Sequence, residues 1–366
     1  MKICYVADGV SLHTQNWLND FAVKGHEVHL LCWKVMPGYN YNIQVHLLKR
    51  YVPKIWPLSQ YASFVYWCLQ VRQLVNDIKP DIIDGHFVTT YGFMAACAGF
   101  HPLVVTAWGS DVLIYSKRNP IFRFTAKYAM NRANAVVCRT AIIKNEISRL
   151  GIDSNKIHVV IHGVDNKKFH SKVRDKGLRK RLGISPDEPV VISTRTLAPL
   201  YDVITLVKAV PIILSKFPTT KFIIIGKGEQ ENHFRKLAVS LGIINNVIFM
   251  GWIDHDKLPC YLSSSDIYIS TSLSDGTSNS LLEAMACNLA PIVSDIPANR
   301  QWIKESVNGF LFPVGDHVAL AEKVIRLLGN NETKMDFGLR SRRIIESDAD
   351  TEKEIQKLEN IYAQLI

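Results

Sequence analysis

Residues 274–286 have the sequence Ser274-Asp275-Gly276-Thr277-Ser278-Asn279-Ser280-Leu281-Leu282-Glu283-Ala284-Met285-Ala286. The small side chains after Asp275 let a ligand approach the backbone closely. Ser278 or Asn279 can cap the helix that follows, which leaves free N–H groups and the positive end of the helix dipole facing outward. Such a helix end binds phosphate or sugar oxygens, and Glu283 lies about one turn further along. Two carboxylates around anion-binding amides suit a nucleotide sugar better than a bare phosphate.

The composition is that of a soluble globular protein, with 48% hydrophobic and 21% charged residues. A chain of 366 residues usually forms two domains. Its seven cysteines include no C-x-x-C pair, which argues against a zinc site or a disulfide framework and for a reducing cytoplasm. No segment reaches the roughly 18 apolar residues that span a bilayer. Met1-Lys2 leads directly into a strand-like run at 3–7, so we expect no signal peptide and a cytoplasmic location.

The net charge of +10 is unevenly distributed. Residues 1–170 carry 19 Lys and Arg against 10 Asp and Glu, whereas the two kinds nearly balance in the remainder. A basic first half suggests contact with an anionic membrane, at the inner face of the cytoplasmic membrane, or with an anionic acceptor. Nucleic acid would give the same imbalance, but the chain has no Arg- or Lys-rich tract and no nucleic-acid motif, so we expect no such partner.

The expected helix at 58–78 presents two different surfaces. Seven residues form a stripe at helical spacing, which indicates a core face: Phe64, Trp67, Cys68, Val71, Leu74, Val75 and Ile78. Other apolar residues fall beside the stripe, near basic ones: Trp56, Tyr61, Val65, Tyr66 and Leu69 near Lys49, Arg50, Lys54 and Arg72. These residues form either an interfacial or lipid-acceptor surface or a further part of the core.

Strand and helix patterns alternate along the whole chain, which predicts an α/β fold of two doubly wound halves. In the first half we expect strands at 3–7, 28–32, 82–84, 103–106, 135–138 and 157–161, with helices near 14–24, 58–78, 90–99, 121–132 and 141–150. In the second half we expect strands at 190–193, 221–225, 246–249, 267–270 and 290–294. A hinge is expected near 162–172, which gives domains of 1–165 and 170–348 and a last helix near 351–365.

The stretch at 274–286 resembles the E-x7-E signature of retaining glycosyltransferases of family 4, which have the GT-B fold; here Asp275 stands in place of the first Glu. The resemblance covers nearly the whole chain. It implies two Rossmann-like domains with a cleft between them, the first binding the acceptor and the second the nucleotide sugar. It also implies that a C-terminal helix, at about 349–366, packs back on the first domain.

Several segments of the first half carry the resemblance further. The turn Asp8-Gly9 and the nearby His13 match a glycine turn of the family, with Asp8 in place of a first Gly. His86 ends a strand where the family often has a His. Residues 104–111 resemble its Thr-x-His-Gly-x-Asp segment, with Trp108 at the His position and Asp111 kept. The resemblance implies that Gly9 binds the donor and that four residues lie on the acceptor side: His13, His86, Trp108 and Asp111.

In the second half, residues that resemble the family's donor site follow successive strands. Arg195 matches the family's Arg, but Tyr201 replaces a Lys, which removes one positive charge at the donor diphosphate. Residues 226–228 resemble a Gly-x-Gly turn, and 249–253 a strand end that contacts the nucleobase. Residues 161–165 resemble an Asn-Gly-Val-Asp turn with His162 for Asn, a mainly structural segment. The resemblance implies a donor site of Gly9, Arg195, Gly226, Lys227, Ile253, Asp275, Gly276, Thr277, Ser278, Asn279, Ser280 and Glu283.

Asp254-His255-Asp256 has the spacing of a metal-binding D-x-D motif. We interpret it as the start of a helix at 257–262, where Asp is a common cap. The related enzymes generally act without a bound metal, so the resemblance implies no metal and no cofactor.

The resemblance implies a retaining, metal-independent hexosyltransferase of polysaccharide or lipopolysaccharide biosynthesis. It would move a sugar from a UDP- or GDP-sugar to a hydroxyl of a lipid-linked or cell-surface glycan. Three residues would carry the reaction: Arg195 at the departing diphosphate, Asp275 at sugar hydroxyls and Glu283 at the ribose. Two other functions remain open. One is a nucleotide-sugar epimerase of GT-B fold, and the other is a catalytically silent subunit, which Tyr201 and Trp108 suggest.

Overall fold

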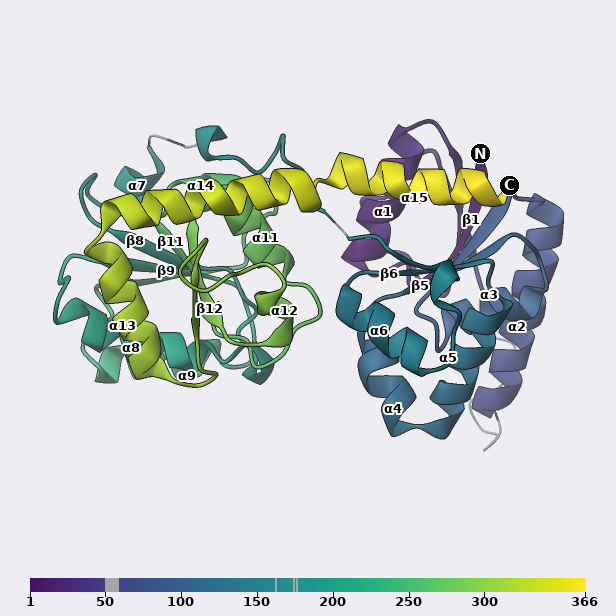
Figure 1. Cartoon of the computed structure of the whole chain (residues 1–366), viewed down its shortest axis with the longest axis horizontal. Coiled ribbons are helices and arrows are strands. Elements are labelled where there is room, and N and C mark those ends of the chain that lie inside the picture. Colours follow the sequence, from purple (N-terminus) through teal and green to yellow (C-terminus); the bar gives the residue numbers. More distant parts are fainter. Residues whose placement is uncertain (50–58, 162, 174, 176) are drawn as a thin grey trace. The chain divides into compact units, whose positions relative to one another are not determined.

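The computed structural model describes residues 1–49, 59–161, 163–173, 175 and 177–366, with the side chains of 59–62 left out. The chain divides into two compact units (Figure 1). The first unit comprises Met1–His162 and Lys353–Ile366, and the second comprises Gly163–Glu352. Each unit holds one parallel sheet with helices packed against it.

The sheet of the first unit has, in the described part of the chain, the strand order β3-β2-β1-β4-β5-β6-β7, all parallel. Its strands are β1 (Lys2–Val6), β2 (Glu27–Cys32), β3 (Ile43–Leu47), β4 (Ile82–His86), β5 (Leu103–Ala107), β6 (Ala135–Cys138) and β7 (Ile157–Val159). The central strands are buried on both faces and carry mostly Val, Ile, Leu and Ala, as parallel sheets require. The order reverses between β1 and β4, which makes the carboxyl ends of these strands the topological switch point.

Helices cover both faces of this sheet. They are α1 (Leu12–Val23), α2 (Ser59–Ile78), α3 (Tyr91–Ala98), the π-helical turn η1 (Asp111–Tyr115), α4 (Ser116–Arg118), α5 (Pro120–Arg132), α6 (Ala141–Arg149), the short 3-10 turn η2 (Ser154–Lys156) and α15 (Thr351–Leu365). The side chains of Ser11 and Thr140 cap α1 and α6 by accepting backbone N–H groups of the first turn.

The expected C-terminal helix is confirmed, and it belongs to the core of the first unit. In Figure 1, α15 (yellow) lies beside α1 and β1 (purple). The ring of Tyr362 stacks on Phe21 at 5.5 Å between centroids, and its hydroxyl donates to the buried Asp84 carboxylate at 2.5 Å. The unit therefore closes its core with residues that follow the whole second unit in sequence.

The second unit repeats the plan. Within the described residues its sheet has the order β10-β9-β8-β11-β12-β13. The strands are β8 (Val190–Ser193), β9 (Lys221–Ile225), β10 (Val247–Gly251), β11 (Ile267–Ser270), β12 (Ala290–Ser294) and β13 (Phe310–Phe312). The helices are η3 (Ser171–Val173), α7 (Leu178–Arg181), η4 (Pro199–Tyr201), α8 (Val203–Leu214), α9 (Glu231–Ser240), α10 (Leu258–Ser263), α11 (Asn279–Ala286), α12 (Pro297–Arg300), α13 (His317–Leu328) and α14 (Asn331–Asp348).

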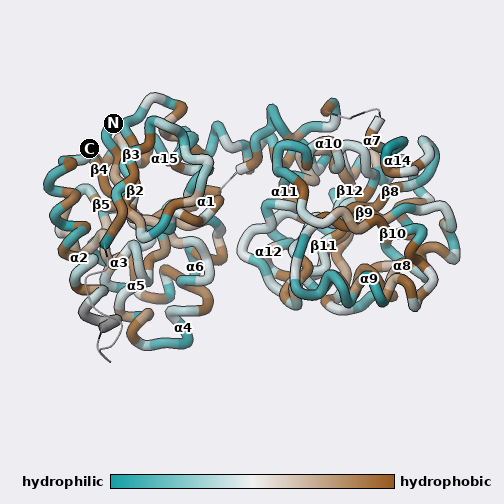
Figure 2. Tube along the Cα trace, turned by 180° about the vertical axis from the view of Figure 1, so that it is seen from behind, coloured by the Kyte–Doolittle hydropathy of each residue, from teal (hydrophilic) through white to brown (hydrophobic). Residues whose placement is uncertain are grey.

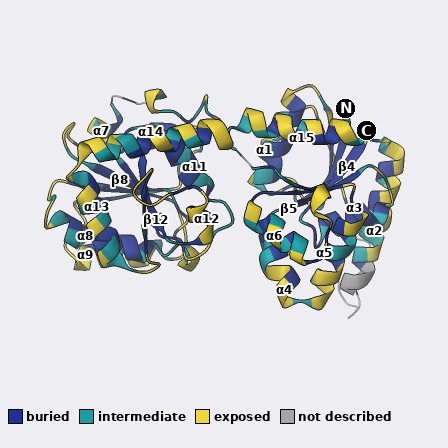
Figure 3. Cartoon of the chain, viewed as in Figure 1, coloured by how far each residue is buried: buried dark blue, intermediate teal, exposed yellow. Residues whose placement is uncertain are grey.

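The hydropathy and the burial of the segments follow this layered arrangement of strands and helices. Hydrophobic colour gathers on strands such as β9, whereas α14 is largely hydrophilic (Figure 2). The strands are correspondingly buried, and the covering helices are exposed on their outer faces (Figure 3). Burial of apolar surface is the main driving force that holds these layers together.

The segments that leave and re-enter the first unit are paired with each other. Val164 N–H donates to the Ala349 carbonyl at 2.8 Å, and Thr351 N–H donates to the Val164 carbonyl at 3.1 Å. A Cβ on Gly163 would lie 2.6 Å from the Thr351 nitrogen, so this close approach requires a glycine. The expected turn at 161–165 thus has a structural role on its described residues, while His162 lies outside them.

Three details differ from the sequence-based expectations. Strand β3 was not predicted, because its exposed edge alternates polar and apolar residues instead of forming a buried run. Strand β13, with three residues, is too short for a periodicity. The predicted Asp cap at 254–256 is wrong. Lys257 is the N-cap of α10 without a side-chain hydrogen bond, and the Asp254 carboxylate instead accepts the Asp256 N–H.

The expected core stripe of α2 is confirmed, with Val71 and Val75 buried and the other five side chains packed against them. Val65 and Leu69, beside the stripe, are exposed. Of the other candidates for an interfacial surface, Lys49 and Arg72 are exposed and Tyr66 is half-buried, while Trp56, Arg50, Lys54 and the Tyr61 side chain lie outside the described residues. No helix in the described ranges is long and apolar enough to span a membrane.

Candidate functional site

Except for Gly9, the residues expected to bind a donor belong to the second unit, and several of them follow the carboxyl ends of neighbouring strands of its sheet. Strands β9, β8 and β11 are neighbours, and their carboxyl ends lead into Gly226, Arg195 and Asp275 respectively. Ligands of open α/β sheets bind at this edge. Hydrogen bonds join the loops: the Thr271 hydroxyl donates to the Tyr201 carbonyl at 2.7 Å.

The guanidinium of Arg195 is at the centre of this cluster and is only 8% exposed. Its Nη1 donates to the hydroxyls of Ser278 and Ser280, both at 2.8 Å, and its Nη2 donates to Asp275 Oδ2 at 2.5 Å. The group therefore uses three of its five N–H donors. Its buried Nε has no hydrogen-bond partner among the described residues. Buried donors are normally paired, so this side of the fork is suited to an oxyanion.

Tyr201 stands where the family resemblance places a lysine, and it contacts Arg195 directly. The guanidinium carbon lies 4.3 Å from the centroid of the Tyr201 ring, which is a cation–π contact. The position thus supplies no second cation, but it holds the one cation of the cluster in place.

The loop before α11 has the geometry that its sequence predicts. Ser278 is the N-cap and accepts the Leu281 N–H at 3.3 Å. The Tyr268 hydroxyl donates to Ser280 at 2.8 Å, which fixes that side chain below the loop. A Cβ on Gly276 would meet no atom within 4 Å, and the Thr277 hydroxyl has no partner in the described part of the chain. Asn279 opens α11.

The Gly226-Lys227-Gly228 turn packs against the backbone that carries Arg195. A Cβ on Gly226 would lie 2.2 Å from the Arg195 carbonyl oxygen, and one on Gly228 would lie 2.2 Å from that of Leu197. Leu197 N–H donates to the Lys227 carbonyl at 3.0 Å. These glycines are required by the approach of two loops of the site, and they leave the exposed Lys227 side chain beside it.

Glu283 has a partner that the sequence did not indicate. Its Oε1 lies 2.8 Å from Nε2 of His255, and the other ring nitrogen of His255 lies 3.1 Å from the Lys168 ammonium. Lys168 also pairs with Asp256 at 2.6 Å. Ile253 lies at the start of this loop, just after β10. Glu283, His255 and Lys168 come from distant segments, so only the tertiary structure could identify these contacts.

The described residues contain no group of three or more His, Cys, Asp or Glu side chains that could hold a metal ion. In the D-x-D segment, Asp256 is exposed and pairs with Lys168, while His255 contacts Glu283.

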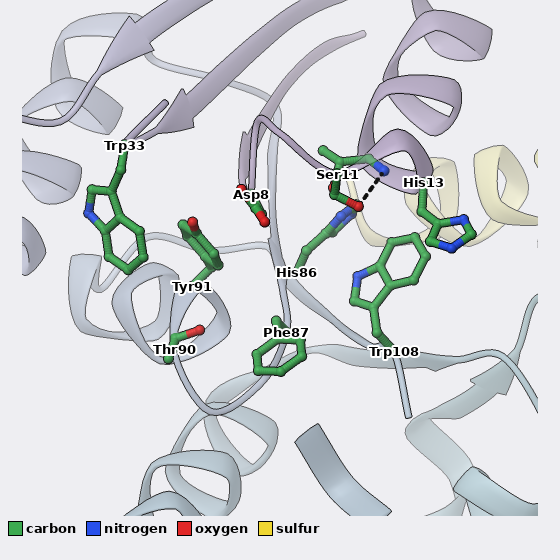
Figure 4. A pocket seen from close by; sticks show the side chains of 10 residues that line it. Asp8, Ser11, His13, Trp33, His86, Phe87, Thr90, Tyr91 and Trp108 are labelled. Carbon is green, nitrogen blue, oxygen red and sulfur yellow. Dashed lines mark hydrogen bonds between the residues drawn. The ribbon is translucent and has the colours of Figure 1, made fainter. Parts of the chain in front are cut away.

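A second group of candidate residues lines a pocket of about 380 Å³ in the first unit. The pocket lies where β1, β2, β4 and β5 end (Figure 4). Ten residues line it: Asp8, Ser11, His13, Thr14, Trp33, His86, Phe87, Thr90, Tyr91 and Trp108. Of the four residues expected on the acceptor side, it brings together His13, His86 and Trp108. Sequence reasoning missed Trp33 and Tyr91, which enter from β2 and α3.

Asp111 lies behind this pocket and does not line it. Its wholly buried carboxylate accepts backbone N–H groups of Val88, Trp108, Gly109 and Val112. Burial raises the pKa of Asp111, and the hydrogen bonds oppose this shift. The residue holds the Trp108-Gly109 turn against β4, so its role is to position Trp108.

Gly9 also has a structural reason to be glycine. A Cβ there would lie 2.3 Å from the Lys34 carbonyl oxygen, because residue 9 pairs with Val35 beyond the end of β2. Gly9 belongs to the first unit, whereas the other expected donor residues belong to the second.

Comparison with known proteins gives this arrangement a family. Residues 153–344 match the family described as "Glycosyl transferases group 1", and residues 2–140 match "Glycosyl transferase 4-like". The chain is 22% identical over 356 residues to N-acetyl-alpha-D-glucosaminyl L-malate synthase of Bacillus anthracis, which covers 94% of this chain and 91% of that protein. It is 23% identical over 312 residues to the Escherichia coli UDP-Gal:alpha-D-GlcNAc-diphosphoundecaprenol alpha-1,3-galactosyltransferase, with 81% and 79% covered.

A solved structure of HepE from Anabaena, in complex with UDP, matches all of this chain and all of its own with a TM-score of 0.83 at 19% identity. The lipopolysaccharide outer core galactosyltransferase WaaB matches with a TM-score of 0.74 at 18% identity, again over the whole of both chains. These likenesses confirm the expected fold of two Rossmann-like units. The chain belongs to the glycosyltransferases of family 4, which are transferase enzymes of the GT-B fold.

Proposed function

We propose that this protein is a retaining, metal-independent glycosyltransferase that moves a sugar from a nucleotide diphosphate sugar to a hydroxyl of a lipid-linked or cell-surface glycan. The observation that carries the proposal is the Arg195 cluster. A buried arginine with two unused N–H donors faces a hydroxyl-rich, side-chain-poor loop at the N-terminus of α11. The complex of HepE with UDP-glucose supports a UDP-sugar as the donor, and a GDP-mannose-dependent mannosyltransferase of Corynebacterium glutamicum, 26% identical over 208 residues, supports a GDP-sugar.

In this proposal the chemistry is chiefly electrostatic. Arg195 binds the diphosphate and stabilises the charge that develops on it as the glycosidic bond to phosphate breaks. The amides and hydroxyls of residues 276–280, with the neighbouring Gly226 and Lys227, hold phosphate and sugar oxygens. Asp275 accepts sugar hydroxyls. Glu283, oriented by His255, accepts the ribose hydroxyls. The departing phosphate takes the proton of the acceptor hydroxyl that attacks from the same face, so no side chain serves as a covalent nucleophile.

We also propose that the first unit meets an anionic membrane, where a lipid-linked acceptor would be found. The support is a surface formed by η1, α4 and α5. It exposes four large apolar residues, Ile114, Tyr115, Ile121 and Phe124, among four basic ones, Lys117, Arg118, Arg123 and Lys127. The acidic residue of these elements, Asp111, is buried, and Lys117 pairs with Glu146 of α6 at 2.7 Å. Apolar side chains that enter the headgroup region and cations that meet anionic lipid are the two parts of such an interface.

The donor site is tested by calorimetric titration with UDP, GDP and ADP, with and without EDTA. We expect one nucleotide to bind equally well in EDTA. Glu283→Gln should weaken it about tenfold, since a charged hydrogen bond is lost. Arg195→Lys, which keeps the charge but loses the fork, should lower kcat by about 100-fold. The exposed Glu332→Gln and Arg300→Lys are matched controls and should match the wild type.

Retention is read separately, from the anomeric configuration of the product by NMR. An inverted product would refute the retaining mechanism. Absence of binding by every nucleotide would contradict the donor site itself. Binding without transfer to any acceptor mixture would support a catalytically silent subunit, and interconversion of the donor without an acceptor would support an epimerase.

A further inference from the structure

The pocket of the first unit has room for one ring and is formed entirely within that unit. Its volume of about 380 Å³ is at the lower end of the roughly 300–1,000 Å³ of small-molecule sites. Polar and aromatic side chains face each other across it. In Figure 4 the Asp8 carboxylate lies among the rings of Tyr91, His86 and Trp108.

The charge of the lining selects the kind of ligand. Among its described residues Asp8 brings a carboxylate, and none is Lys or Arg. Asp8 Oδ1 accepts the Val10 N–H at 3.2 Å, while Oδ2 has no partner in the part of the chain described. Burial, with the charge of Arg139, lowers the pKa of His13 to about 4, so this ring is neutral near pH 7. The buried Arg139 lies against Trp108 but does not line the pocket. An anionic ligand would therefore face Asp8 without a cation among the lining residues, whereas a hydroxyl would donate to it.

His86 has two buried ring nitrogens for which the described residues supply no hydrogen-bond partner. Its ring is 1% exposed, and Nε2 lies 3.7 Å from Asp84 Oδ2, beyond hydrogen-bond distance. Buried polar groups are normally paired, so this ring calls for a ligand. A ring nitrogen of His donates when it carries a proton and accepts when it does not, and a hydroxyl can pair with either kind.

Trp108 supplies a fixed apolar surface. His13 stacks on it at 5.5 Å, His86 packs against it edge-on at 5.3 Å, and the Arg139 guanidinium lies 5.0 Å from its centroid. With its backbone held by Asp111, the indole is locked on several sides and half-buried. A rigid aromatic face of this kind packs against the C–H face of a sugar ring at low entropic cost.

We propose that this pocket binds one uncharged, hydroxyl-bearing sugar ring of the acceptor, and that it rejects rings that carry a carboxylate or phosphate. Hydroxyls of the ring donate to Asp8 and pair with His86, and its C–H face packs on Trp108. The assignment of the ring to the acceptor rests on the proposed transferase function, but the choice of a neutral ring rests on the pocket alone.

The test is saturation-transfer NMR of the whole protein with matched pairs of methyl glycosides: glucoside with glucuronide, and galactoside with galacturonide. We expect signals from a neutral glycoside and none from its uronide. Asp8→Asn should weaken the neutral ring about tenfold or more, because a charged hydrogen-bond acceptor is lost. Trp108→Leu should weaken it comparably. Asp77→Asn, an exposed carboxylate on α2, is the matched control and should leave binding unchanged.

Charge reversal provides the sharper arm, since Asp8→Lys should shift the preference from the glycoside to the uronide. Equal binding of both classes by the wild type, no binding of any neutral ring, or indifference to Asp8→Asn and Trp108→Leu would each overturn the proposal. Nucleotide titration of the same samples distinguishes the donor-site hypothesis from the sugar-ring hypothesis. Absence of nucleotide binding would refute the donor site in the second unit without affecting the result for the glycosides.

Discussion

Tyr201 contacts the single buried cation of the Arg195 cluster. Its ring covers the Arg195 guanidinium at 4.3 Å and takes the position of the lysine that the family resemblance predicts. The Tyr201 ring keeps the N–H donors of Arg195 in one orientation, whereas a lysine at this position would add a second charge on a flexible side chain. The cluster therefore depends on the orientation of Arg195 more than on total charge.

Substitutions at position 201 test this dependence. Tyr201→Phe keeps the ring and should leave nucleotide affinity within about twofold. Tyr201→Leu removes it and should weaken nucleotide binding by about three- to thirtyfold, which corresponds to a cation–π contact of roughly 0.5–2 kcal/mol. Calorimetric titration with the preferred nucleotide measures both. If Leu binds as tightly as Phe, the stacking has no part in holding Arg195.

His13 makes the stability of the first unit depend on pH. Its pKa is about 4 in the folded protein against an ordinary 6.5, so the unfolded chain binds the extra proton first. Stability is therefore lost as pH falls from 6.5 to 4, by no more than about 3 kcal/mol from this group. Urea denaturation at pH 7.5 and 4.5 should show a smaller loss for His13→Gln than for the wild type. The exposed His233→Gln should lose as much as the wild type.

For single residues, the sequence predicts those contacts that follow from the order of the strands. Arg195 and the 275–280 loop follow adjacent strands, so their contact follows from the fold. The contact of Glu283 with His255 and the entry of Tyr91 into the pocket do not, because they depend on how α10 and α3 pack. The residue-by-residue roles in donor and acceptor binding stay predictions.

Among the elements, η1, α4 and α5 form a stretch, residues 111–132, in which exposed apolar and basic residues alternate and the acidic residue, Asp111, is buried. Of the expected interfacial surface on α2, the described side chains of Val65, Leu69 and Arg72 are exposed, and Tyr66 is half-buried. Sequence periodicity identifies the buried stripe of a helix well. It does not tell which of the exposed residues outside the stripe form a common surface with a neighbouring helix.

Vesicle sedimentation tests the surface formed by η1, α4 and α5. The protein should bind phosphatidylcholine vesicles that contain phosphatidylglycerol and not vesicles of phosphatidylcholine alone. Phe124→Ser and the pair Arg118→Ser with Arg123→Ser should each lower the bound fraction about tenfold, since each removes roughly 1–3 kcal/mol. Val239→Ser, on α9 of the second unit, exposes a similar apolar side chain and is the control. Binding unaffected by the substitutions of Phe124, Arg118 and Arg123 would exclude this surface.

For the whole molecule, the first unit is discontinuous in sequence. Residues 1–162 lack the helix that covers Phe21 and whose Tyr362 donates, with the Thr106 hydroxyl, to the buried Asp84. The sequence predicts the two repeated halves well, because buried parallel strands give continuous apolar runs. The return of the last helix is predicted only through the family resemblance, since an amphipathic pattern does not state which sheet it covers.

Removal of α15 should therefore unfold the first unit and leave the second folded. A chain ending at residue 352 should lose one of two thermal transitions in calorimetry, and a peptide of residues 351–366 added in trans should restore it. Tyr362→Phe leaves the Asp84 carboxylate without this donor and should lower the same transition by several degrees. Retention of both transitions in the shortened chain would show that α15 is dispensable.

The discontinuity of the first unit also sets an order of events at the ribosome. Residues 163–352 are complete in themselves and emerge before α15, so the unit whose chain is made second is the first that can finish folding. Until α15 emerges, the apolar surface around Phe21 is not covered by this helix, and the Asp84 carboxylate lacks the Tyr362 donor. A nascent chain in that state is a substrate for chaperones, and a ribosome that stalls before residue 353 leaves a protein with a finished second unit and an open first unit.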